Sequence, residues 1–222
     1  MINTLIFDLD GTLLNTLDDL HASVCFALQQ AGLPLVEKND TRRFLGNGIK
    51  KLIYQSVNHV CPQADEILKA HVLDTFRTYY VEHSMDKTAP FEGILPMLHA
   101  CKQRGLFTAI VSNKLDPAVK ILHQHFFADC IDIAIGETPT IQRKPAPDMV
   151  HESIRQLSLL HATQILSSNS IYIGDSEVDI QTAQNSQLPC ISVTWGFRDQ
   201  DFLLQSGAKT LIHHPSELLH LI

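Results

Sequence analysis

The sequence predicts an α/β protein with a doubly wound, parallel, Rossmann-like sheet and an inserted all-helical cap domain. Short apolar segments rich in β-branched residues alternate with helical patterns over most of the chain, which is typical of parallel strands joined by crossover helices. One long stretch, residues 15–88, carries helical patterns and no convincing strand. We therefore expect a core domain formed by residues 1–14 and 89–222 and a cap domain formed by residues 15–88.

The strands of the core are expected where short apolar runs occur, at residues 3–8, 107–112, 131–135, 170–174, 190–194 and 209–212. Helical patterns lie between most of them. Residues 94–104 carry an apolar stripe, and Pro117 and Pro147 each lie in the first turn of a helix, where the missing N–H costs no hydrogen bond. A further helix is expected over 177–186.

The predicted cap contains helices at about residues 16–31, 47–59 and 63–83. A stretch of this size is too long for a crossover, which usually has one helix and about two to six loop residues at each end. It is therefore interpreted as an inserted domain. The chain is expected to return to the core near Thr88-Ala89-Pro90.

The composition excludes several classes of protein. The chain has 222 residues, of which 45% are hydrophobic and 18% charged, as in an ordinary globular protein with a sizeable core. A formal net charge of −7 offers no basic surface for nucleic acid. Five cysteines without a C-x-x-C pair favour reduced thiols, and the chain shows neither a secretory leader nor a membrane-spanning run. We expect a cytoplasmic protein with no nucleic-acid or membrane partner.

Two acids, Asp8 and Asp10, follow the apolar run Thr4-Leu5-Ile6-Phe7. Ionised carboxylates at the end of a buried strand need a compensating partner. With further acids from elsewhere in the chain, this pair would hold a hard cation and provide a nucleophile and an acid. The pair taken alone is equally compatible with an acidic surface turn.

Polar groups follow other predicted strands as well. Ser112-Asn113-Lys114 follows the second strand, Arg143-Lys144-Pro145 the third, and Gly174–Asp179 the fourth. Each has a structural explanation when taken singly, such as a helix cap or a solvated loop charge. Ligands of open α/β sheets, however, bind outside the carboxyl ends of the strands. A hydroxyl, a lysine and several carboxylates at that one edge therefore predict a functional site.

These segments resemble the four motifs of the haloacid-dehalogenase-like superfamily, in the same order and over the whole chain. The matching residues are Asp8-x-Asp10-Gly11-Thr12, Ser112, Lys144-Pro145 and Gly174-Asp175-x-x-x-Asp179. The long insert resembles the helical cap of the first cap class. Within the superfamily the chain is most similar to phosphoglycolate-phosphatase-like enzymes. Ser112 stands where threonine is common, and both side chains supply a hydroxyl.

The resemblance implies hydrolysis of a small phosphorylated metabolite, of the phosphoglycolate type, through an aspartyl-phosphate intermediate. It implies that Asp8 is the nucleophile and that Asp10 first protonates the leaving group and then activates water. Ser112 and Lys144 would bind the transferring phosphoryl oxygens. Thr12, at the end of the first motif, and Asn113, beside the second, are further expected to contact substrate.

The resemblance also implies a Mg²⁺ cofactor, held by Asp8, by the backbone carbonyl of Asp10 and by Asp175. Asp179 would act directly, through water, or by orienting its neighbours. The charge count independently requires a cation, because four aspartates and Lys144 sum to a formal −3 that would repel phosphate.

Substrate choice is expected to depend on the cap, within the stretch Arg42–Lys51. There Gly46, Asn47 and Lys50 combine a flexible turn, a helix start and a cation, suited to a substrate carboxylate or a second phosphate. A helix start with solvated basic residues explains the stretch equally well. A sugar-phosphate mutase and an inorganic pyrophosphatase share this chemistry and remain alternatives, and a non-catalytic phospho-ligand-binding module is a third.

Overall fold

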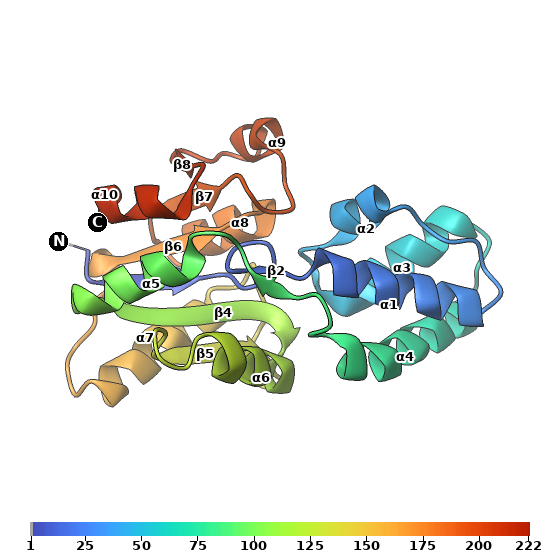
Figure 1. Cartoon of the computed structure of the whole chain (residues 1–222), viewed down its shortest axis with the longest axis horizontal. Coiled ribbons are helices and arrows are strands. Elements are labelled where there is room, and N and C mark those ends of the chain that lie inside the picture. Colours follow the sequence, from blue (N-terminus) through green and yellow to red (C-terminus); the bar gives the residue numbers. More distant parts are fainter. Residues whose placement is uncertain (1) are drawn as a thin grey trace. The chain divides into compact units, whose positions relative to one another are not determined.

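The computed structural model describes residues 2–222 and divides the chain into two compact units, Met1–Leu14 with Pro90–Ile222, and Asn15–Ala89. The first unit contains a six-stranded sheet in the order β5-β4-β1-β6-β7-β8 (Figure 1). All of the described pairings between these strands are parallel. The strands are β1 (Thr4–Phe7), β4 (Phe107–Leu115), β5 (Ile133–Glu137), β6 (Ser170–Gly174), β7 (Cys190–Val193) and β8 (Leu211–Ile212).

Helices cover both faces of this sheet, as the side chains of β1 show. Leu5 and Phe7 pack in one apolar cluster with residues of α5 (Ile94–Gln103) and α6 (Asp116–Phe126), and Ile6 packs in a second cluster with residues of α7 (Asp148–Leu160). This alternation is the period of a strand buried on both sides. The predicted doubly wound sheet is thus confirmed. The helices of this unit are α5 (Ile94–Gln103), α6 (Asp116–Phe126), α7 (Asp148–Leu160), α8 (Glu177–Asn185), α9 (Gln200–Gln205) and α10 (Leu218–Leu221), with 3₁₀ turns η1 (Ser167–Asn169) and η2 (Pro215–Glu217).

The direction of winding changes at β1. From β1 the chain continues to β4 and β5 on one side, and it then returns to β6 on the other side of β1. The carboxyl ends of β4, β1 and β6 are therefore neighbours, and the crevice at such a reversal is where open α/β sheets bind ligands.

The second unit is helical, and the two short strands β2 (Leu14–Asn15) and β3 (Ala89–Pro90), which pair with each other, lie where the chain passes from one unit to the other. Its helices are α1 (Leu17–Gln30), α2 (Lys38–Phe44), α3 (Gly48–Val60) and α4 (Glu66–His83). The sequence did not predict α2, whose KNDTRRF segment has no apolar stripe; a reciprocal capping box between Glu37 and Asp40 starts it instead. Over residues 2–222, no helix has both the length and the apolar character needed to span a bilayer.

A buried carboxylate joins the two ends of the helical unit. Asp19, at the start of α1, accepts hydrogen bonds from the backbone N–H groups of Lys87 and Thr88 and from the Thr88 hydroxyl, at 2.8 to 3.0 Å. The three donors replace the water that Asp19 loses on burial, so this contact fixes the segment that leaves α4.

Replacing Asp19 by alanine is expected to destabilise the helical unit by about 2–4 kcal/mol, because three donors would lose a charged acceptor. Urea denaturation followed by circular dichroism measures the effect. The matched control is Asp18→Ala, which removes a half-exposed carboxylate paired with Lys38 and should cost less than about 1 kcal/mol. Equal losses in the two variants would contradict this account of Asp19.

Thiol reactivity should follow burial. Burial is the main cause of a raised pKa at three thiols. The pKa of Cys101 is raised to about 11, and those of Cys130 and Cys190 are each raised to about 12, with Asp129 adding to the effect at Cys130. At pH 8 at most about one molecule in a thousand then carries a thiolate at any one of these sites. In a titration with Ellman's reagent the buried Cys101 and Cys130 should react only after unfolding, whereas the partly exposed Cys61 should react first. A Cys61→Ser variant that keeps the fast phase would contradict this.

Candidate active site

The site begins where β1 ends. The Asp8 N–H continues the sheet by donating to Ile173 O at 2.9 Å, and the chain then turns at Gly11, whose φ of 91° lies in the left-handed region that glycine adopts most readily. Asp8 and Asp10 consequently lie at the carboxyl edge of the sheet. Asp8 is 8% exposed and Asp10 is half-buried.

Lys144 is at the centre of the site. Its Nζ donates to Asp8 Oδ1 at 2.7 Å, to Asp179 Oδ1 at 2.8 Å and to the Tyr172 hydroxyl at 3.0 Å. These three acceptors use all the donors of one ammonium group. The side-chain amide of Asn113 donates to Lys144 O at 3.1 Å, which ties the loop that carries Lys144 to β4.

Asp179 is fully buried and surrounded by donors. Its Oδ1 accepts from Lys144 and from Tyr172, and its Oδ2 accepts from the backbone N–H of Ser176 at 3.1 Å and from the Ser176 hydroxyl at 2.6 Å. Ser176 is the N-cap of α8, and Asp179 completes a capping box with it. Burial raises the pKa of Tyr172 well above its ordinary value, so its hydroxyl remains a donor. The four hydrogen bonds match the about four lone-pair positions of a carboxylate.

Asp175 is held by the turn after β1 and by the loop after β7. Thr12 Oγ1 donates to Asp175 Oδ1 at 3.3 Å, and the Phe197 N–H donates to Asp175 Oδ2 at 2.7 Å. Arg198, the next residue of this loop, makes a bidentate ion pair with Glu177, with nitrogen–oxygen distances of 2.8 and 3.2 Å. Two of the lone-pair positions of Asp175 are thus occupied, which leaves room for further ligands.

Three glycines allow the backbone to approach these carboxylates closely. A Cβ on Gly11 would lie 2.4 Å from Asp175 Oδ2, one on Gly174 would lie 2.3 Å from Asp179 Cβ, and one on Gly196 would lie 2.3 Å from Asp175 Cβ. Real Cβ atoms essentially never approach so closely. Both aspartates are therefore placed by surfaces that only glycine can form.

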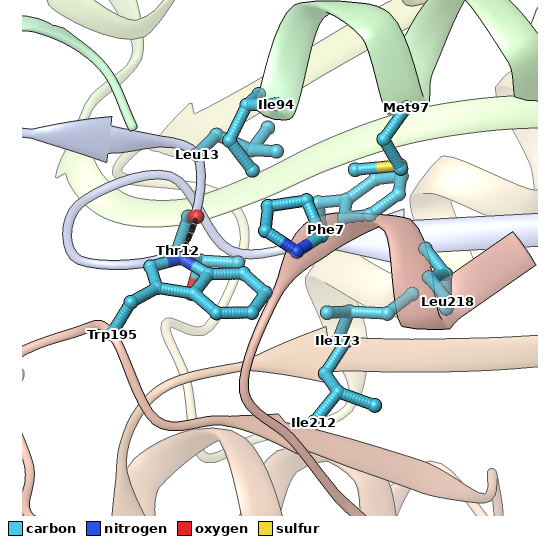
Figure 2. Close-up of a pocket in the computed structure, with 10 residues that line it drawn as sticks. Phe7, Thr12, Leu13, Ile94, Met97, Ile173, Trp195, Ile212 and Leu218 are labelled. Atoms are coloured by element: carbon cyan, nitrogen blue, oxygen red, sulfur yellow. Dashed lines mark hydrogen bonds between the residues drawn. The ribbon is translucent and has the colours of Figure 1, made fainter. Parts of the chain in front are cut away.

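Behind the turn the site rests on tightly packed apolar side chains (Figure 2). The Trp195 ring lies there, and its Nε1–H donates to Thr12 O at 3.0 Å. The space beneath, lined among others by Phe7, Leu13 and Ile173, has no room for a water molecule. This packing fixes the backbone of the turn without adding a ligand pocket.

A second lysine lies at this edge of the sheet. Lys114 Nζ donates to both oxygens of Asp10, at 2.8 and 3.2 Å, and the Lys114 N–H donates to Ser112 Oγ at 3.2 Å. Lys114 is buried and was absent from the residues predicted for the site. With it, four carboxylates face two ammonium groups, which gives a formal charge of −2 in place of −3.

The positive charge near the site does not fully balance its carboxylates. Burial raises the pKa of Asp8 well above its ordinary value, and Asp179 adds to the effect while Lys144 opposes it. The pKa of Asp175 is raised to about 7, mainly by burial and then by Asp179. Burial opposes the charge of Lys144, but Asp179 and Asp8 outweigh it and hold its pKa well above the ordinary value.

The donor set fits a hard divalent cation. One oxygen from each of Asp8, Asp175 and Asp179 lies within 4.8 Å of the others, and all three residues are buried. Carboxylate oxygens are the ligands that Mg²⁺ and Ca²⁺ prefer, and a cation would offset the repulsion that raises the pKa values of Asp8 and Asp175.

The structure brings together most of the residues predicted from the sequence. Those at the carboxyl edge of the sheet are Asp8, Asp10, Thr12, Ser112, Asn113, Lys144, Asp175 and Asp179. Of these, Thr12 donates a side-chain hydrogen bond to Asp175, and Asn113 donates one to the backbone oxygen of Lys144. The other three lie in the helical unit: Gly46 in the turn after α2, Asn47 at the N-cap of α3, and Lys50 over the Tyr54 ring.

Lys114, Tyr172, Ser176 and the loop after β7 contact the site carboxylates but were not among the site residues predicted from the sequence. Tyr172 carried a usable signal, because a tyrosine in a buried strand needs a partner for its hydroxyl. Lys114 belongs to the Ser112-Asn113-Lys114 segment after the second predicted strand, and nothing in that segment indicates that the lysine pairs with Asp10. Phe197 contributes only a backbone N–H, for which no side-chain pattern exists.

A doubly wound sheet that gathers buried carboxylates and lysines at its carboxyl edge is the arrangement of an α/β enzyme. The chain belongs to the haloacid dehalogenase-like hydrolases: the model of that family, described as "Haloacid dehalogenase-like hydrolase", matches residues 5–193. The resemblance drawn from the sequence is thereby confirmed.

Within this family of hydrolases, the chain is similar to several phosphoglycolate phosphatases. The phosphoglycolate phosphatase of Yersinia pseudotuberculosis serotype I (strain IP32953) is 28% identical over 96% of this chain and 90% of its own length. That of Rhodobacter capsulatus is 32% identical over 89% and 87%. The crystal structure of a candidate phosphoglycolate phosphatase from Lactobacillus delbrueckii subsp. bulgaricus has a TM-score of 0.90 and 34% identity, covering 99% of this chain and 98% of that one. The protein is a phosphatase similar to these enzymes.

Proposed function

We propose that the protein is a Mg²⁺-dependent phosphomonoester hydrolase that acts on a small phosphorylated metabolite of the phosphoglycolate type, through an aspartyl phosphate on Asp8. One observation carries the proposal: the Lys144 ammonium bridges Asp8 and Asp179 at 2.7 and 2.8 Å, beside the buried Asp175. A carboxylate placed between a lysine and a cation site is suited to attack an anionic phosphate.

Asp8 is the carboxylate best placed to react. It is 8% exposed, against 1% for Asp175 and 0% for Asp179, and the described hydrogen bonds engage only its Oδ1. In the proposed first step a carboxylate oxygen of Asp8 forms a bond to phosphorus while the bond from phosphorus to the leaving oxygen breaks. Asp10 gives its proton to that oxygen. Asp10 then takes a proton from the water that displaces Asp8 from phosphorus.

Lys144 and Ser112 would bind the phosphoryl oxygens during transfer. The raised pKa of Lys144 keeps it charged at neutral pH, so it balances Asp8 before substrate binds and faces the developing negative charge afterwards. Ser112 is buried at the end of the neighbouring strand β4, where its hydroxyl is suited to a phosphoryl oxygen.

Mg²⁺ would be held by Asp8, Asp175 and the backbone carbonyl of Asp10. It would supply the positive charge that the carboxylates lack and that a phosphate substrate also requires. Since Asp179 already accepts four hydrogen bonds, we assign it to orienting Lys144 and to contacts through water instead of direct ligation.

We further propose that residues 15–88 act as the cap and select the substrate. Gly46, Asn47 and Lys50 would contact its second anionic group, and Thr12 and Asn113 would line the phosphate side. The reduced thiols inferred from the sequence support a cytoplasmic enzyme.

Metal removal tests the cofactor. Incubation with EDTA should lower phosphate release from p-nitrophenyl phosphate by about 100-fold or more, and added Mg²⁺ should restore it. Mg²⁺ should also raise the melting temperature of the metal-free protein, because it binds only the folded site. Full activity in EDTA would contradict the assignment.

A panel of phosphorylated metabolites ranked by kcat/KM tests the substrate. The proposal expects phosphoglycolate to rank above pyrophosphate and hexose phosphates. Pyrophosphate at the top would make the protein a pyrophosphatase. Conversion of one hexose phosphate isomer into another, without phosphate release, would make it a mutase.

A further inference from the structure

We infer that Lys114 is a positioning residue for Asp10, which it holds and stabilises as the carboxylate formed when Asp10 gives its proton to the leaving group. The inference rests on the proposed function and adds a second lysine to it. Its basis is the pair of hydrogen bonds from Lys114 Nζ to Asp10 Oδ1 and Oδ2, at 2.8 and 3.2 Å.

The pair is built into the fold. The Lys114 side chain is 4% exposed and that of Asp10 is 21% exposed, so Lys114 is shielded while Asp10 stays within reach of solvent. The charge of a shielded lysine acts on its partner with less screening than that of a surface lysine. Both oxygens of Asp10 accept from its Nζ, at 2.8 and 3.2 Å, so the lysine and the carboxylate hold each other in place.

An irregularity in β4 places Lys114 there. The pairing of β4 with β5 shifts register between Val111 and Leu115, and such bulges redirect side chains beside active sites. The strand continues through Ser112 and Lys114 to Leu115 with its polar residues buried. One strand end thus supplies a hydroxyl for the phosphoryl group and a cation for the proposed acid.

The two lysines serve different aspartates. Lys144 bonds Asp8 and Asp179, whereas Lys114 bonds Asp10. Loss of Lys144 therefore affects the nucleophile, and loss of Lys114 affects the acid. With Asp10 ionised, as it is after giving up its proton, four carboxylates and two ammonium groups sum to a formal charge of −2, which a single divalent cation neutralises.

The chemical consequence concerns the leaving group. When the bond from phosphorus to the leaving oxygen breaks, its electron pair stays on that oxygen, which takes the proton from Asp10. The negative charge then appears on Asp10, where Lys114 donates two hydrogen bonds. An alkoxide needs that proton, whereas p-nitrophenolate leaves readily without it. Lys114 should therefore matter for alkyl phosphates and hardly at all for p-nitrophenyl phosphate.

The test compares kcat/KM for p-nitrophenyl phosphate, for phenyl phosphates of graded leaving-group basicity and for phosphoglycolate. Lys114→Gln should lower kcat/KM about 10- to 100-fold for phosphoglycolate and less than about threefold for p-nitrophenyl phosphate, with a steeper dependence on leaving-group basicity than wild type. In an Asp10→Asn background, Lys114→Gln should have little further effect. Lys120→Gln, on the exposed side of α6, is the matched control and should behave as wild type.

Equal losses for all the esters would overturn the inference, as would additive losses in the double variant. Lys114→Arg keeps the charge and should retain most of the activity toward phosphoglycolate; an arginine variant as slow as the glutamine variant would also overturn it. Absence of Asp8-dependent turnover in wild type, with every ester, would instead contradict the proposed function.

Discussion

Replacing Asp8 by asparagine is expected to lower kcat by at least about 10⁴-fold toward every phosphate ester, because the proposed covalent intermediate forms on the Asp8 carboxylate and an amide is a far weaker nucleophile. Asp8 is the most exposed of the three clustered carboxylates, and Lys144, which bonds it, also bonds Asp179. Neither Asp175 nor Asp179 can replace it without giving up its own hydrogen bonds.

The fold should tolerate this change. Asparagine has nearly the shape of the uncharged acid, and burial already disfavours the charged form of Asp8, as its raised pKa shows. The melting temperature of metal-free Asp8→Asn should therefore stay within a few degrees of wild type, about 1 kcal/mol or less in stability. Asp129→Asn, at an exposed position, is the control for activity.

Acid quenching during turnover tests the same prediction more directly. Wild type should carry phosphate on the peptide that contains Asp8, in a form that hydroxylamine removes, and Asp8→Asn should carry none. Phosphate on any other residue, or a variant that retains more than about one hundredth of the wild-type rate, would rule out Asp8 as the nucleophile.

Replacing Lys144 by glutamine should impair both activity and stability. The change leaves Asp8, Asp175 and Asp179 buried without their common counter-ion, and breaking a buried pair in this way costs about 3–5 kcal/mol. We expect a kcat about 10²- to 10⁴-fold lower, because the developing phosphoryl charge would lose a donor.

Urea denaturation with and without Mg²⁺ separates the two effects. Because a bound cation replaces part of the lost charge, Mg²⁺ should stabilise Lys144→Gln more than it stabilises wild type. The exposed Lys209 gives the control, since Lys209→Gln should change neither quantity. A Lys144→Gln protein as stable as wild type in EDTA would mean that the charge of Lys144 is not needed to hold the carboxylates together.

The parallel sheet and its polar edge were predictable from the sequence because they depend on local signals. The apolar segment of β6, Ser170–Gly174, was predicted with the bounds that the structure has. The acids that follow β1 and β6 stood out because a carboxylate at the end of a buried apolar strand is costly unless a cation or hydrogen-bond donors compensate its charge.

The remaining features depend on contacts between distant residues. The strand predicted over 107–112 continues to Leu115, because the burial of Ser112 and Lys114 is decided by partners such as Asp10. Asp19 has the pattern of an ordinary first-turn helix acid, and its role depends on Thr88, which lies far away in sequence. No periodicity can encode such pairs.

Gly11, Gly174 and Gly196 have a genetic consequence. Any missense change in their codons adds a Cβ, and at each position that atom would lie within 2.4 Å of an atom of Asp175 or Asp179. These codons should therefore tolerate substitution as poorly as those of the reactive acids, although the glycines carry no functional group. In a deep mutational scan for phosphatase activity, the three glycines should fall in the same intolerant class as Asp8.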